Sequence, residues 1–302
     1  MTTQSDFPAP AVSAGGTDGV IHNIGYRGYQ GQRLGRGYAT RSLFVQGLRG
    51  AFGLGRSAKS KVLPMLVLAG ATLPAGLLVA MALARKATEY GTDYPQYLSG
   101  IGLLFFEIFV AAQAPVLLSR DLRYSTVPLY FSRPITRGDY VRAKGAAMVA
   151  AMLVVTVLPL LVLYVGALLG GMDFAHNTEH FAIGLLAALL YSLLFSAIGL
   201  VIAATTPRRG FGVAAIMGVL VITEAVASVL GHLTGDPQAD STQWAYVIGP
   251  SSLVERFVNR ICGLSTDFPT TPGAAGAVVF GVEILVLVAG AYALLLRRYR
   301  KI

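Results

Sequence analysis

Residues 146–169, AAMVAAMLVVTVLPLLVLYVGALL, form a run of 24 residues without a charged side chain. A helix of about 20 apolar residues is long enough to cross the hydrocarbon core of a bilayer. We therefore expect this run to be a transmembrane helix.

Five other runs are similar, each with at most one charged residue: 63–84, 97–118, 181–204, 211–230 and 274–296. Hydrophobic residues make up 54% of the chain and charged residues 13%, which is far from the composition of a typical soluble domain. The six runs predict an all-α integral membrane protein with six transmembrane helices.

The distribution of Lys and Arg predicts the topology. Of the 24 Lys and Arg residues, 20 lie before the first run, between the second and third, between the fourth and fifth, or after the last. The other four are Arg85, Lys86, Arg256 and Arg260. Because cytoplasmic segments carry an excess of Lys and Arg, we expect both termini in the cytoplasm. Anionic lipid explains these flanking charges better than nucleic acid does.

Composition also suggests a source and a domain layout. Arg outnumbers Lys 19 to 5, and Ala and Gly are abundant, which favours a GC-rich bacterial genome and hence a bacterial plasma membrane. Residues 1–38 are expected to be a largely disordered cytoplasmic tail, because the first 20 have no apolar period. Residues 39–302 are expected to form the membrane domain.

Two segments outside the runs have an amphipathic pattern. Residues 39–57 predict a basic interfacial elbow helix, although four glycines leave an irregular linker as the alternative. The pattern consists of Leu43, Phe44, Leu48 and Phe52 on one stripe and Arg41, Arg49 and Arg56 off it.

Residues 249–263, GPSSLVERFVNRICG, predict a short amphipathic helix in the outer loop between the fifth and sixth spans. Ser252 and Glu255 have the spacing of a capping box. The helix would pack on the ends of the spans or contact cargo; its apolar stripe consists of Leu253, Val254, Phe257, Val258 and Ile261.

Two motifs are incomplete. Residues 53–60, GLGRSAKS, nearly match a phosphate-binding loop, but Ala58 replaces a glycine and no soluble nucleotide fold surrounds them. His176 and His180, near Asp173 and Glu179, would suit a metal only on a helix, and a solvated loop is favoured. We expect no catalytic residue, cofactor or metal on this chain.

Three acids lie inside the predicted spans: Glu107, Glu224 and Glu283. A carboxylate in hydrocarbon is costly, so such groups usually face the bundle interior or a wet cavity. They are candidates for a translocation path or gate, and structural hydrogen bonding is the alternative for each.

Residues 119–144, SRDLRYSTVPLYFSRPITRGDYVRAK, separate the second and third runs and hold six of the 24 basic residues. Acids, aromatics and turn formers accompany them, a mixture that favours a folded docking surface. The segment resembles the one after the second span in permeases of the type-2 ATP-binding-cassette exporter family. The matching positions are Ser119, Asp121, Ser125, Thr126, Ser132, Arg133, Pro134, Ile135, Arg137, Tyr140 and Lys144.

The resemblance implies a non-catalytic membrane subunit with a coupling segment at 119–144. It implies two separate ATPase subunits, which would carry ATP and Mg²⁺, and a second copy of the chain or a sister permease. Salt bridges to the ATPase would come from Arg120, Asp121 and Arg123, apolar contact from Tyr124, Leu129, Tyr130 and Phe131, and the turn into the third span from Arg133, Pro134 and Arg137.

Two alternatives remain at this point. The 119–144 segment could bind lipid phosphates and nothing else. The chain could also be a proton- or ion-coupled secondary transporter that uses the intramembrane glutamates, in which case it would need no ATPase. The resemblance favours export, and the sequence does not indicate the cargo.

Overall fold

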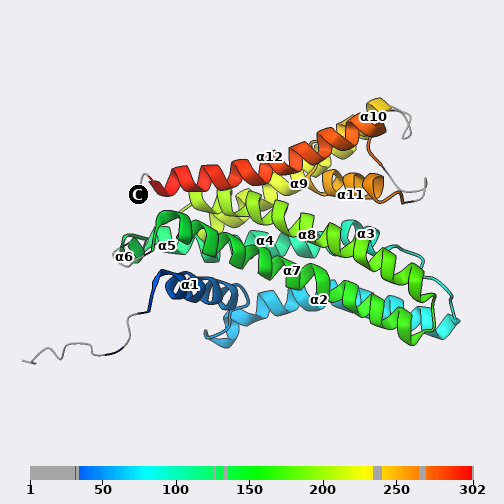
Figure 1. Ribbon diagram of the computed structural model, residues 1–302, viewed down its shortest axis with the longest axis horizontal. Helices are drawn as coiled ribbons and strands as arrows, with labels where there is room; N and C mark the ends of the chain where they lie inside the picture. The colour runs from blue at the N-terminus through cyan, green and yellow to red at the C-terminus, as the bar shows by residue number, and fades with distance from the viewer. Residues whose placement is uncertain are drawn as a thin grey trace, which may run out of the picture. The chain divides into compact units, whose positions relative to one another are not determined.

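The apolar runs form helices because a helix hydrogen-bonds its own backbone groups, which is the condition for leaving water. The computed structural model describes residues 31, 34–124, 127–131, 135–233, 240–264 and 270–300. These residues contain helices and turns and no strand (Figure 1). The predicted N-terminal tail lies mostly outside the described residues, and Gly35–Ile302 forms one compact unit.

Six helices are long and apolar enough to cross a membrane, and each contains one of the six predicted runs. The prediction of six spans is therefore confirmed. They are α2 (Ala58–Arg85), the continuous segment Tyr94–Arg123, α7 (Arg137–Leu169), α8 (Phe174–Thr205), α9 (Arg209–Leu233) and α12 (Gly273–Arg300).

The second span contains a non-α-helical turn near its N-terminal end. It consists of α3 (Tyr94–Tyr97), the π-helical turn η1 (Leu98–Gly102), α4 (Leu103–Leu117) and α5 (Ser119–Arg123). A π-turn shifts the register of the residues that follow it, and such turns are frequent at functional sites. Here the turn comes one helical turn before Glu107.

The third span begins earlier than its apolar run. Thr136 Oγ1 accepts a hydrogen bond from the Asp139 backbone N–H at 3.3 Å, and Asp139 Oδ2 accepts one from the Thr136 backbone N–H at 3.1 Å. This capping box starts α7 at Arg137. Residues 137–144, which were expected in the loop, therefore form the first turns of α7.

The shorter helices lie at the ends of the bundle. They are α1 (Arg36–Ala51), α6 (Val127–Phe131), α10 (Asp240–Ala245) and α11 (Pro250–Ile261), together with α3 and α5. In Figure 1, α1, α5, α6 and the end of α12 gather at one end, whereas α3, α10 and α11 lie at the other. The end with α5 and α6 is called the α5–α6 end below, and the opposite one the α11 end.

Three spans form the centre of the bundle. The span that contains α4 is the most buried, followed by α7 and α8, while α2, α9 and α12 keep most of their apolar surface exposed. Helix α7 packs against α1, α2 and α8, and α8 packs against α4 and α12. Small residues allow close approach: a Cβ at Gly199 of α8 would lie 2.7 Å from Val110 Cγ2 of α4.

Helix α1 spans Arg36–Ala51, so it begins three residues before the predicted elbow segment 39–57 and ends six residues before the end of that segment. The chain turns at residues 52–57, so those residues are not helical. Leu43 and Phe52 are buried, Phe44 and Leu48 pack against the core, and Arg49 is exposed. The apolar stripe therefore covers α7 and α4.

Helix α11 starts two residues before Ser252, so the predicted capping box is wrong. Its N-cap is Gly249 and Pro250 is its first residue, a position where proline fits because its missing N–H would be unpaired anyway. Ser252 Oγ instead donates to the Gly249 carbonyl oxygen at 3.2 Å. Most of α11 is buried against α8, α9 and α12.

The tight α4–α8 contact generates a stability prediction. Gly199→Leu forces a side chain into Val110 and should destabilise the protein by about 1–3 kcal/mol, seen as a lower thermal midpoint in detergent. Gly218→Leu is the matched control, because a Cβ at Gly218 meets no atom within 4 Å. Equal midpoints for the two variants would contradict this account of the packing.

Candidate functional site

A buried ion pair connects α5 to α7. Lys144 Nζ lies 2.8 Å from Asp121 Oδ2, and the two side chains are only 9% and 13% exposed. The Tyr140 hydroxyl donates a second hydrogen bond to Asp121 Oδ2 at 2.9 Å. Because both charged groups are largely removed from water, removing either one would leave the other as an uncompensated buried charge.

Tyr140 is also the centre of an aromatic cluster. Its ring lies 5.7 Å from that of Tyr130, 6.2 Å from Phe131 and 5.0 Å from Tyr299. Aromatic rings at these separations attract each other beyond the area they bury. The cluster packs α6 against α7 and the end of α12. Because Tyr140 also bonds to Asp121 on α5, the second, third and sixth spans and α6 meet at Tyr140.

The start of α7 is joined to α1 by a second charge cluster. Arg36 Nε lies 2.5 Å from Asp139 Oδ2, and Arg142 Nη2 lies 3.0 Å from Asp139 Oδ1. The hydrogen bond and charge of Asp139 raise the pKa of the Arg36 guanidinium further above its ordinary value. Arg36 and Arg142 are exposed, so this cluster fixes orientation more than it adds stability.

An exposed patch remains on the short helices after these contacts. Tyr124 and Leu129 are 64% and 67% exposed, and Arg120 and Arg123 are exposed beside them. These four residues are called the α5–α6 surface below. It combines two cations with apolar side chains, the composition of a protein-binding patch.

The structure places the predicted coupling residues in different roles. Asp121 is engaged with Lys144 and Tyr140, whereas Tyr130 and Phe131 are half-buried in the aromatic cluster. The Arg137 guanidinium lies 5.4 Å from the centre of the Phe131 ring. Arg133 and Pro134 lie outside the described residues, as do Ser125, Thr126 and Ser132.

Two of the three intramembrane acids interact with each other, and one of them contacts α11. Glu107 on α4 is buried with 6% exposure, and its carboxylate interacts electrostatically with that of Glu224 on α9. Glu224 Oε2 accepts a hydrogen bond from the Ser251 backbone N–H at 3.3 Å. Glu224 thereby caps the first turn of α11.

The same region contains two charged residues of α11 that sequence reasoning did not select. Burial raises the pKa of Glu255 above its ordinary value, although a hydrogen bond from Ser99 and the charge of Arg256 oppose the shift. The Arg256 guanidinium lies 3.6 Å from the centre of the Tyr246 ring. The sequence shows that Glu255 and Arg256 belong to an amphipathic segment, but it does not show that their side chains turn toward the spans.

Glu283 is not part of this cluster. It lies half-buried on α12, and within the described part of the chain no salt bridge or hydrogen bond joins it to Glu107 or Glu224. Nothing in the structure gives it the capping contact that Glu224 has.

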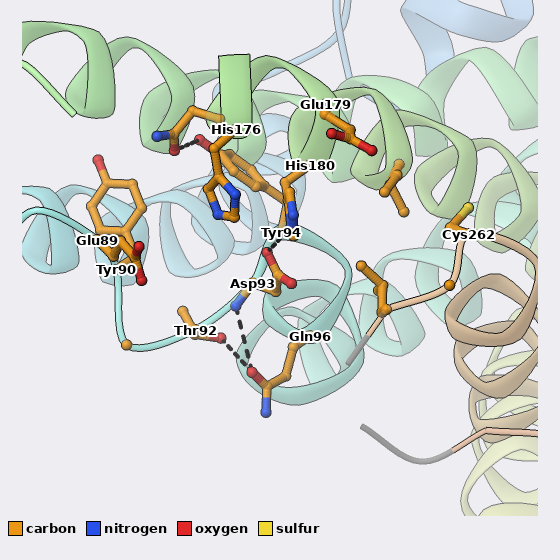
Figure 2. A pocket seen from close by; sticks show the side chains of 15 residues that line it. Glu89, Tyr90, Thr92, Asp93, Tyr94, Gln96, His176, Glu179, His180 and Cys262 are labelled. Carbon is orange, nitrogen blue, oxygen red and sulfur yellow. Dashed lines mark hydrogen bonds and ion pairs between the residues drawn. The ribbon is translucent and has the colours of Figure 1, made fainter. Parts of the chain in front are cut away.

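A cavity of about 640 Å³ opens at the α11 end, between the α2–α3 connection and the start of α8 (Figure 2). Asp93 Oδ1 and His180 Nδ1 lie 2.7 Å apart in it, and the rings of His176 and His180 are 4.0 Å apart. Burial raises the pKa of Tyr90 to about 12. The hydroxyl therefore stays protonated and donates to the Leu163 carbonyl oxygen at 2.8 Å.

The histidines were expected on a solvated loop, which is wrong, because both lie in the first turns of α8. Asp173 caps that helix by accepting a hydrogen bond from the His176 backbone N–H at 2.6 Å. Even so, the described residues contain no group of three or more His, Cys, Asp or Glu side chains placed to hold a metal.

Six apolar spans, with a folded segment between the second and third, define a multi-pass membrane protein. The model of the ABC-2 family transporter proteins matches residues 75–300, and the chain belongs to this family. Permease domains of this kind are generally non-catalytic. A search of curated proteins found no significant match. The ion-coupled alternative receives no support from these comparisons.

The buried ion pair generates the second prediction. Asp121→Asn leaves Lys144 charged and unpaired and should cost about 3–5 kcal/mol, measured as a lower thermal midpoint in detergent. The double variant Asp121→Asn/Lys144→Met removes both charges and should recover most of the loss. A double variant as unstable as the single one would show that the pair is not the cause.

Proposed function

We propose that the chain is the membrane-spanning subunit of an ATP-driven exporter and receives its ATPase on the α5–α6 surface. Two ATPase subunits would bind ATP and Mg²⁺ and serve a pair of permeases, either two copies of this chain or this chain and a sister permease. The observation that carries the proposal is the exposed patch of Arg120, Arg123, Tyr124 and Leu129, on short helices that contact the spans through Asp121, Tyr130 and Phe131.

The internal contacts of the segment support a coupling role. A force on α5 reaches α4 directly along the chain. It reaches α7 through Asp121 and Lys144, and α12 through the rings of Tyr140 and Tyr299. Packed elements joined by buried polar contacts move together. The ATP cycle of a partner would therefore move three spans at once.

The proposal assigns the α5–α6 end to the cytoplasm of a bacterial cell. Both chain ends and most Lys and Arg residues belong to this side by the charge count. Helix α1 would then be the elbow at the inner surface. Helix α11 would lie at the outer leaflet, where the Glu224 cap and its buried residues hold it against the spans.

We assign different roles to the three intramembrane acids, Glu107, Glu224 and Glu283. Glu107 is buried in the central span and interacts electrostatically with Glu224, which holds the first turn of α11. A change in the protonation or position of Glu107 would therefore be felt at the outer helix, so we assign Glu107 and Glu224 to an outer gate. Glu283 stands apart on α12 as a candidate for the path.

The ATPase-docking role is tested by charge reversal. Arg120→Glu/Arg123→Glu should abolish copurification with a coexpressed ATP-binding-cassette ATPase and stop ATP-dependent export, because two attractive contacts become repulsive. Membrane insertion and thermal midpoint should stay near those of the unmodified chain, since both side chains are exposed.

Arg297→Glu/Arg298→Glu is the matched control for this experiment. It makes the same charge change at exposed positions of α12, outside the proposed docking patch. It should keep the ATPase bound. Equal loss of ATPase in both variants, or normal export by Arg120→Glu/Arg123→Glu, would refute docking at this surface.

The orientation is tested with the single cysteine, which lines the cavity at the α11 end. Cys262 should react with a membrane-impermeant maleimide in intact cells. Burial raises the pKa of its thiol, so less thiolate is present at neutral pH and the rate should keep rising at a pH where an ordinary thiol has levelled off. Cys262→Ser/Leu129→Cys should react only after permeabilisation; the reverse pattern would invert the topology.

A further inference from the structure

Four arginines from three separate segments line one cavity at the α5–α6 end. The cavity has a volume of about 230 Å³, and its cationic residues are Arg56, Arg120, Arg123 and Arg209. They come from the α1–α2 connection, from α5 and from the first turn of α9. No sequence motif links these positions, so only the fold brings the guanidinium groups together.

A second cavity adjoins the first, because Arg56 and Arg120 line both. It has a volume of about 590 Å³ and extends along α1, where Arg41 and Arg49 add two more cations. Polar side chains make up much of its lining, and the apolar part of its rim is exposed: Tyr38 at 58%, Val45 at 40% and Leu54 at 44%. Charge thus lies beside exposed apolar surface.

The turn between α1 and α2 holds Arg56 in this position. Gly53 and Gly55 have φ angles of 66° and 80°, which side chains rarely adopt. A Cβ at Gly53 would also collide with the Ser60 backbone. The sequence that resembles a phosphate loop is therefore a tight connection whose glycines turn the chain so that Arg56 reaches both cavities.

The positive charge of the cluster is not balanced within the described residues. None of the four arginines forms a salt bridge there. Asp121 attracts Arg56, but that carboxylate is already held by Lys144 and Tyr140. The pKa of the Arg56 guanidinium is lowered, first by burial and then by the charges of Arg120 and Arg209. A bound anion would relieve this repulsion.

We propose that the two cavities bind one anionic phospholipid, with its phosphate among the four arginines and its acyl chains along the exposed apolar side chains of Tyr38, Val45 and Leu54. The planar guanidinium fork matches phosphate oxygens, and basic pockets beside spans are suited to anionic headgroups. Free phosphate would leave the apolar rim unused.

The bound lipid would connect three parts of the protein. Its phosphate would contact the α1–α2 turn, α5 and the start of α9, which are separate contributors to the cavity. Anionic lipid would then stabilise the position of α5. Placing the lipid in the inner leaflet rests on the orientation proposed above, whereas headgroup binding itself does not.

The experiment uses the full chain, delipidated in detergent and without an ATPase, so a failure of ATPase docking does not affect it. Short-chain dioctanoyl phosphatidylglycerol, dioctanoyl phosphatidylcholine and inorganic phosphate are titrated while the thermal midpoint is followed. Phosphatidylglycerol should raise the midpoint in a saturable way, and the other two should have little effect at the same concentrations.

The variants Arg56→Gln and Arg209→Gln should each weaken phosphatidylglycerol binding about fivefold, the effect of removing one basic group near an anionic headgroup. Arg208→Gln is the matched control, since Arg208 is an exposed neighbour that lines neither cavity. Because Arg209 is exposed, its variant stays informative even if Arg56→Gln is unstable.

Three outcomes would overturn the proposal. Unchanged phosphatidylglycerol binding in Arg209→Gln would exclude the cavity, and an equal loss in Arg208→Gln would reduce the effect to general surface charge. A response to inorganic phosphate equal to that of the lipid would indicate a free-anion site. If no lipid binds while an ATPase protects Arg56 from arginine-modifying reagents, the cluster faces an acidic protein partner.

Discussion

The α5–α6 end of the protein depends on one carboxylate, that of Asp121. It receives the charge of Lys144 and a hydrogen bond from Tyr140, and Tyr140 in turn contacts the rings of Tyr130 and Tyr299. Because the pair is largely buried, losing one member leaves an uncompensated charge in an apolar setting. These contacts join the short helices to α7 and α12, whereas Arg120 and Arg123 stay exposed.

At the α11 end, polar contacts also hold a short helix against the spans, but they are hydrogen bonds to backbone groups. Glu224 caps the first turn of α11 through the Ser251 backbone N–H, and the Tyr191 hydroxyl donates to the Ser251 carbonyl oxygen at 3.1 Å. Between the two ends, α4, α7 and α8 pack through apolar and small residues. Polar contacts thus specify how the short helices sit at each end, while apolar packing and internally bonded helices satisfy the bilayer region.

The arginine cluster of Arg56, Arg120, Arg123 and Arg209 lies beside the Asp121 ion pair. Asp121 is held by Lys144 and Tyr140, and its attraction offsets only part of the repulsion that Arg120 and Arg209 exert on Arg56. The ion pair that fixes α5 therefore also leaves a site of positive potential beside it. A protein that keeps such a site at a bilayer surface has a ready ligand in anionic lipid.

The sequence alone determined the spans, because each must supply about 20 apolar residues, and it identified the 119–144 segment by its motif. The sequence could not show which residues of that segment are buried and which are exposed. From the sequence, Asp121 is a surface charge like Arg120 and Arg123, and Glu255 belongs to a capping box with Ser252. Only the tertiary structure decided that both turn inward, since their partners, Lys144 and Ser99, are set by how helices pack and not by spacing along the chain.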